Sequence, residues 1–158
     1  MSPQNASPQR VRVLPAILLG GSIAGAMDIT AALVVYGRFG LKPIPLLQGI
    51  AAGILGTRAW DGGLPTAALG LLLHFVIAYS AAAAYFVFSR RFAFLIAHPV
   101  VSGILYGPAV YFFMNRIVVP LSRARRYPFS VEMMVIGIAI HIVCVGFPIA
   151  FGVRKYSK

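Results

Sequence analysis

Long apolar runs separated by short polar and basic segments dominate the chain. The first run extends from Val13 to Tyr36 and is interrupted only by Asp28. Its 24 residues, rising about 1.5 Å each as an α-helix, are long enough to cross a hydrocarbon core of about 30 Å. Three further runs of similar length follow it. The pattern therefore predicts four membrane-spanning helices, over residues 13–36, 64–88, 92–121 and 131–153.

The segment between the first two runs has a different pattern. Residues 46–56 (LLQGIAAGILG) are apolar, but segments of about 10–14 residues are too short to span and more often lie in the interface or re-enter the bundle. Pro43 and Pro45 precede this segment, and the turn-rich sequence TRAWDGG follows it. We therefore expect a short interfacial or re-entrant helix here. The expected fold is all-α, a transmembrane four-helix bundle with this one additional short helix.

Polar segments at both ends frame a single transmembrane domain. Residues 1–12 form a disordered polar tail in this interpretation, residues 13–153 the helical domain, and residues 154–158 a basic tail. A signal peptide cleaved near Ala24-Gly25-Ala26 is the alternative for the first run. Because the apolar run continues for ten residues beyond that site, we favour an uncleaved first span.

The composition supports a chain that is solvated by lipid. Hydrophobic residues make up 59% and charged residues 11% of it, against about 45–50% and about 25% in globular domains. The net charge is +11, and nearly all the basic residues flank the apolar runs, where cations meet anionic lipid head groups. The expected partner is the lipid bilayer, with a homo-oligomer or a membrane-protein partner as further candidates, and not nucleic acid. The basic residues do not predict which side of the membrane holds the two termini. Seven of them would lie on the side of the termini and six on the other side.

Each predicted span carries a polar or ionisable residue within the apolar sequence. We call this set the polar layer, because counting along antiparallel spans places its members within about one helical turn, 5.4 Å, in depth. Placing an ionisable side chain in the hydrocarbon core costs free energy, so each such residue is a candidate functional residue. The polar layer consists of Asp28, His74, Asn115 and His141, with Gln48 and Arg116 as additional contributors.

Three interpretations of the polar layer follow from its residue types. The first is a structural hydrogen-bond network that joins the helices. The second is the pathway of a small proton- or cation-coupled transporter or channel, because a carboxylate and two imidazoles can titrate near neutrality. The third is a haem or metal site, with His74 and His141 as axial ligands or with Asp28 as a third ligand. Two isolated histidines are weak evidence for a cofactor, so none is expected.

Small residues at a spacing of four predict close contacts between helices. These positions are Gly21, Gly25, Gly49, Gly53, Gly103 and Gly107. The signatures of soluble enzymes are missing from the sequence: there is no P-loop, G-x-S-x-G, H-E-x-x-H or dinucleotide fingerprint. The chain is therefore not expected to be an enzyme, and no catalytic residues are assigned.

Three short patterns resemble those of a known group of proteins. They are Gly21-x-x-Ala24-Gly25-x-x-Asp28, Gly70-x-x-x-His74-Phe75 and Gly137-x-x-x-His141. Together they resemble the YagU-like family of small bacterial inner-membrane proteins, and the likeness extends over most of the chain. The resemblance implies a multi-pass protein of the bacterial cytoplasmic membrane and brings no catalytic residues with it.

Overall fold

The computed structural model describes residues 12–125 and 129–157, which are almost entirely helical and contain no strand. Four helical stretches among them are long and apolar enough to cross a membrane: Val13–Arg38, Gly63–Arg91, Pro99–Leu121 and Val131–Tyr156. The all-α fold class is therefore confirmed. The predicted disordered tail lies outside the described residues except for Arg12. In the predicted basic tail, α-helix continues through Tyr156.

The first half of the chain forms two long helices joined by a short one. Gly40 and Gly56 take φ values of 84° and 61°, left-handed conformations that glycine adopts without steric penalty, and they follow the ends of the first two helices. The elements are α1 (Val13–Arg38), α2 (Pro43–Leu55), the 3₁₀ helix η1 (Gly56–Trp60), α3 (Gly63–Arg91) and the single-turn α4 (Phe94–Ala97).

The second half contains two spans that are each interrupted by a π-helical segment. The third span consists of α5 (Pro99–Phe113), η2 (Met114–Val118) and α6 (Val119–Leu121). The fourth consists of α7 (Val131–Ile140), η3 (His141–Gly146) and α8 (Phe147–Tyr156).

The third span begins seven residues later than the sequence pattern predicts, at Pro99 instead of Phe92. Phe92 has extended backbone angles and ends α3, and the single turn α4 then leads to His98. His98 precedes a proline, a position at which steric contact with the proline ring disfavours the α conformation. Hydropathy alone does not detect this break, because the residues between the two helices are also apolar.

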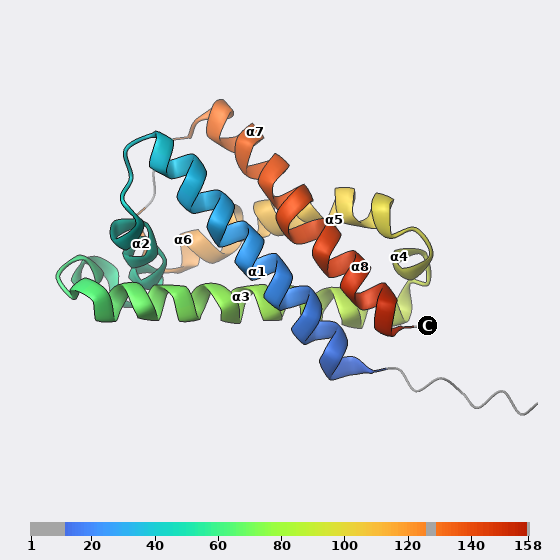
Figure 1. The fold of residues 1–158 in the computed structure, drawn as a ribbon. Helices are drawn as coiled ribbons and strands as arrows, with labels where there is room; N and C mark the ends of the chain where they lie inside the picture. Colours follow the sequence, from blue (N-terminus) through green and yellow to red (C-terminus); the bar gives the residue numbers. More distant parts are fainter. Residues whose placement is uncertain (1–11, 126–128, 158) are drawn as a thin grey trace, which may run out of the picture.

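The four spans form two antiparallel pairs that cross each other obliquely. In Figure 1, α1 and the α7–α8 stretch run diagonally over α3 and α5. The described ends of the chain lie at one end of the molecule, where the Arg12 amide donates to the Tyr156 carbonyl over 3.2 Å. The short helix α2 lies against α3 at the opposite end, and the amide of Arg123 donates to the carbonyl of Gly53 over 2.9 Å. Helix α2 thus caps the bundle instead of crossing it.

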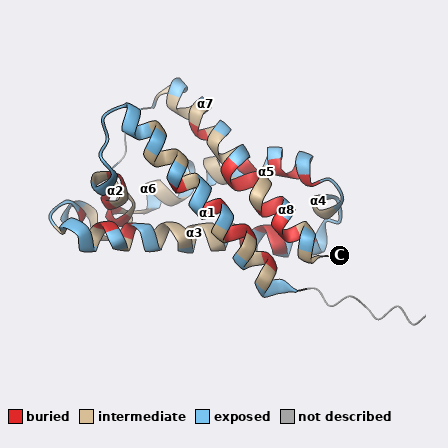
Figure 2. Cartoon of the chain, in the orientation of Figure 1, coloured by how far each residue is buried: buried red, intermediate tan, exposed pale blue. Residues whose placement is uncertain are grey.

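Small residues and a few aromatic rings form the centre of the bundle. Figure 2 shows the buried positions concentrated where α1, α3, α5 and α8 meet. Two tyrosine hydroxyls donate to backbone carbonyls there: Oη of the buried Tyr85 to Leu95 O at 2.9 Å, and Oη of the partly buried Tyr106 to Ala81 O at 2.7 Å. The outward faces remain apolar, as expected of helices surrounded by lipid. The main cluster comprises Ala16, Ala24, Ala82, Tyr85, Phe86, Val145, Ile149, Ala150 and Val153.

Candidate functional site

Asp28 of α1 and His141 of η3 face each other across the helix interface. Oδ1 of Asp28 lies 4.0 Å from Nδ1 of His141, and each side chain is about one-fifth exposed (19% and 20%). The same Nδ1 lies 2.8 Å from the carbonyl oxygen of Gly137. A carbonyl can only accept, so Nδ1 carries the hydrogen and donates it within its own helix. The contact with Asp28 is longer than a hydrogen bond and is therefore electrostatic.

The π-helical segment η3 positions His141 toward α1. Segments of this type are frequent at functional sites. Both π segments of this chain end two residues before a proline, η2 before Pro120 and η3 before Pro148. A proline has no N–H, and its ring crowds the carbonyl four residues earlier, so the preceding turn must widen or kink. We attribute both segments to this cause.

The side chain of His74 connects α3 to the backbone of α1. Its Nε2 lies 2.9 Å from the carbonyl oxygen of Gly25, one helical turn before Asp28. The two helices approach closely here, because a Cβ on Gly25 would lie 2.8 Å from the ring of Phe75. A second polar contact, between the hydroxyls of Ser22 and Tyr79 at 2.9 Å, reinforces the same interface. His74 and His141 thus contact α1 within one helical turn of each other, at Gly25 and at Asp28.

Asn115 does not belong to this level, so its assignment to the polar layer was wrong. It lies on an exposed face, and its Nδ2 donates to the carbonyl of Tyr111 in its own helix over 2.9 Å. The residue of the third span that is level with His141 is Gly107, eight positions earlier, or about 12 Å along a helix. Counting from the predicted ends assumes parallel axes, whereas the spans cross obliquely.

Tyr111 takes the place that sequence reasoning gave to Asn115. Its ring packs edge-on against the His141 ring, with centroids 5.4 Å apart. It also covers Gly137, where a Cβ would meet the Tyr111 ring at 2.5 Å. The only sequence signal for a contact of Tyr111 with His141 is its position one turn before Asn115. This signal is weak, because many tyrosines in apolar spans pack against neighbouring helices without any functional role.

Gln48 and Arg116, the two additional contributors, lie elsewhere. Gln48 is 4% exposed on α2, and its Nε2 donates to the Gly63 carbonyl over 3.1 Å and to the Thr66 hydroxyl over 3.2 Å. Arg116 is exposed, and no carboxylate among the described residues forms an ion pair with it. Gln48 therefore fastens α2 to α3, and Arg116 does not contribute to the site around Asp28.

Four of the six predicted packing glycines are sites of close helix contact. A Cβ at Gly21 or Gly25 would collide with an aromatic ring of α3, and at Gly103 or Gly107 it would collide with the fourth span. Gly49 and Gly53 have only ordinary contacts, 3.7 Å to Trp60 and 3.8 Å to Ser122. Their prediction was wrong because α2 presents another face to α3. The close contacts that the spacing rule missed are at Gly20, Gly70, Gly137, Gly146 and Gly152.

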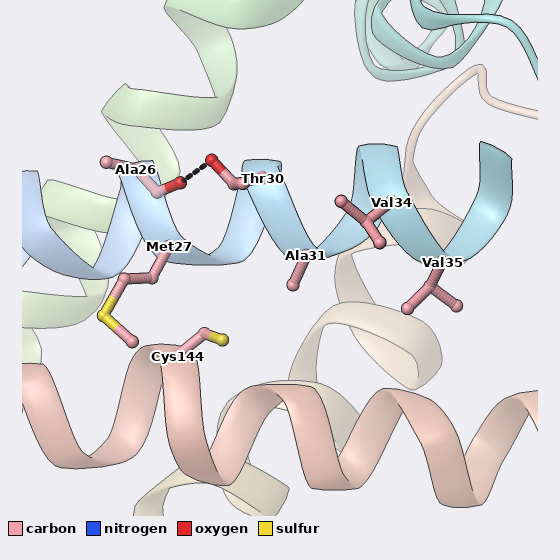
Figure 3. A pocket seen from close by; sticks show the side chains of 7 residues that line it. All are labelled: Ala26, Met27, Thr30, Ala31, Val34, Val35 and Cys144. Atoms are coloured by element: carbon pink, nitrogen blue, oxygen red, sulfur yellow. Dashed lines mark hydrogen bonds between the residues drawn. The ribbon is translucent and has the colours of Figure 1, made fainter.

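An open groove of about 570 Å³ lies between α1 and η3, and neither Asp28 nor His141 is among the residues that line it. Figure 3 shows Met27 and Ala31 pointing from α1 toward the helix that carries Cys144. The Thr30 hydroxyl is already bonded to the Ala26 carbonyl at 2.7 Å. The groove is therefore apolar and offers a conducted ion almost no ligands. Its lining residues are Ala26, Met27, Thr30, Ala31, Val34, Val35 and Cys144.

The donor geometry does not favour a metal centre. In the part of the chain that the structure describes, no three His, Cys, Asp or Glu side chains come together as a ligand set. A metal ion held by two histidines and one carboxylate would need His74 as a ligand together with Asp28 and His141. The Nε2 of His74 instead bonds to the Gly25 carbonyl.

No family model, curated protein or solved structure matches the chain. The class of protein therefore rests on the fold. Four long apolar helices are compatible with a multi-pass membrane protein.

Proposed function

We propose that the chain is a non-enzymatic, multi-pass integral membrane protein of the bacterial cytoplasmic membrane. In this proposal its intramembrane polar groups hold the bundle together, and it acts as a structural or accessory component, as a homo-oligomer or with a membrane-protein partner. The four apolar spans support the membrane assignment. The resemblance of the Asp28, His74 and His141 patterns to those of the YagU-like family supports the bacterial one.

The use of the ionisable side chains in contacts between helices carries this proposal. His74 joins α3 to α1 by its bond to the Gly25 carbonyl, and Asp28 joins α1 to His141 of the fourth span. Polar groups in a bilayer require such partners, because no water is available there to satisfy them. The groove between α1 and η3 is apolar and is lined by neither Asp28 nor His141, which fits a structural pair better than an ion pathway.

A double-mutant cycle tests the structural role. Asp28→Asn and His141→Asn, alone and combined, are compared by unfolding in detergent, with Thr30→Ala as a control that removes only an own-helix bond. We expect a coupling free energy of about 0.6–2 kcal/mol between the two sites. Wild-type proteoliposomes should pass protons no faster than protein-free vesicles. Additive single effects together with a wild-type proton flux would contradict the proposal.

A small proton- or cation-coupled transporter or channel is the second candidate. It is favoured by the partial exposure of Asp28 and His141, and by the absence of any hydrogen bond to the Asp28 carboxylate from the described residues. Carboxylates inside membrane spans often mark the ion pathways of transporters. In this case the proteoliposome experiment gives the opposite result: the wild type conducts, and Asp28→Asn abolishes the flux.

A further inference from the structure

Five cationic side chains gather at the end of the bundle where the described chain begins and ends. Arg12 precedes α1, Arg90 and Arg91 end α3, and Arg154 and Lys155 lie in the last turn of α8. All of them are exposed except Arg154, which is partly buried. We call these five residues the basic end.

Tertiary packing, and not the sequence alone, brings these residues together. Ala16 of α1, Tyr85 of α3 and Val153 of α8 belong to one buried cluster. The backbone bond from Arg12 to Tyr156 fixes the start of α1 against the end of α8. Figure 1 shows these three helix ends, together with α4, at the same end of the molecule.

The described part of the chain supplies no carboxylate to neutralise the basic end. Its acidic residues are Asp28 at membrane depth and Asp61 and Glu132, which lie at the opposite end after η1 and in the first turn of α7. The only ion pair among the described residues is that of Asp28 with His141. The Lys155 ammonium lies 5.7 Å from the neighbouring Tyr156 ring, a contact that leaves its charge in place.

Helix dipoles do not account for the accumulated charge. The carboxyl ends of α3 and α8 each carry roughly half a negative charge, whereas the start of α1 carries about half a positive one. The net compensation is small beside five cations. The remaining exposed charge is therefore available to an anionic partner at the membrane boundary.

We propose that the basic end binds the head groups of anionic phospholipids. Arginine can engage a phosphate through two parallel hydrogen bonds, and its aliphatic stem can lie along the apolar helix ends. Basic residues next to spans attract anionic lipid through both specific contacts and the surface potential. The lipid phosphate thus replaces the carboxylates that the chain lacks, and this end lies in the leaflet richer in anionic lipid.

Lipid retention in detergent gives a direct test. The full chain is purified from vesicles of equimolar phosphatidylcholine and phosphatidylglycerol, and the bound lipid is quantified. We expect the wild type to retain phosphatidylglycerol preferentially. Replacing Arg90, Arg91, Arg154 and Lys155 by Gln should reduce this preference by about tenfold or more. The matched control replaces four cations of the opposite end by Gln, namely Arg38, Lys42, Arg123 and Arg125.

Equal losses in the two quadruple variants, or no lipid preference in the wild type, would overturn the proposal. The wild type provides a test that does not depend on variant folding. Raising the salt from about 0.01 to about 1 M shortens the Debye length from about 30 to about 3 Å, so the preference should fall. A salt-independent preference would contradict it. Displacement of the lipid by millimolar inorganic phosphate would instead indicate a simple anion site and would also overturn the lipid assignment.

Discussion

Glycines at the helix crossings leave almost no room for a side chain. A Cβ on Gly107 would lie 2.6 Å from Cα of Ile142, and one on Gly146 would meet the backbone of Gly103. Backbone atoms cannot rotate away as a flexible side chain can. The third and fourth spans therefore depend on glycine at these positions to reach their observed separation.

Gly107→Ala should destabilise the folded protein by about 1–3 kcal/mol, because the added methyl group forces the two spans apart. The change is measured by unfolding in a mild-detergent and denaturing-detergent mixture. Gly37→Ala is the matched control, since a Cβ there meets nothing within 4 Å and alanine favours a helix over glycine. Equal stability of the two variants would show that the close contact is absent.

At this residue scale the sequence predicted part of the site. The selection of Asp28 and His141 as intramembrane polar groups followed from their positions well inside apolar sequence, whereas the contact between them is a finding of the structure. Asn115 was misplaced because depth was counted from span ends, which ignores the oblique crossing. The contact of Tyr111 with His141 could not be predicted, since it depends on how the third span is rotated about its axis.

At the scale of elements, prolines shape the spans. Pro148 follows η3, in which His141 occupies the first position, and His98-Pro99 separates α4 from α5. A π segment accommodates one additional residue and so changes the direction of the side chains on either side of it. The orientation of His141 toward Asp28 therefore depends on Pro148.

Pro148→Ala should allow η3 to relax toward a regular α-helix, because it restores an N–H donor and removes the crowding ring. We expect the coupling free energy between Asp28 and His141 to fall toward zero in this background, as measured by repeating the double-mutant cycle. Pro65→Ala is the control, since Pro65 lies in the first turn of α3, where no intrahelical donor is lost. Unchanged coupling in Pro148→Ala would refute the link.

The attachment of α2 to the bundle depends on Gln48. Gln48→Leu keeps the volume but removes the bonds to the Gly63 carbonyl and the Thr66 hydroxyl, at an expected cost of about 1–3 kcal/mol. Hydrogen exchange over residues 43–60 should become faster while exchange in α1 is unaffected. Thr57→Ala, at an exposed position on η1, is the control and should leave the exchange rates unchanged.

The elements were the most predictable level of the structure. The first span and the fourth begin at Val13 and Val131, as the sequence indicates, because hydropathy changes abruptly at these positions. The second begins within one residue of its predicted start. The third could not be placed correctly, since the break at His98-Pro99 arises from backbone sterics within apolar sequence.

At the scale of the whole molecule, the fold combines an apolar exterior with cationic ends. The described termini share one end, and α2 with its flanking turns lies at the other. This arrangement requires an even number of crossings. The proposed structural role and the proposed lipid contact both depend on it, because both assume that Asp28 lies at membrane depth and that the basic end lies at the boundary.

Cysteine labelling of the membrane-embedded protein tests this arrangement most directly. Single cysteines replace Phe39, Thr57, Ala93 or Lys155 in a Cys144→Ala background, and an impermeant maleimide is applied to vesicles of each orientation. Four spans predict that positions 39 and 57 react from one side and positions 93 and 155 from the other. Reaction of positions 39 and 57 from opposite sides would show that α2 crosses the bilayer and would contradict the four-span account.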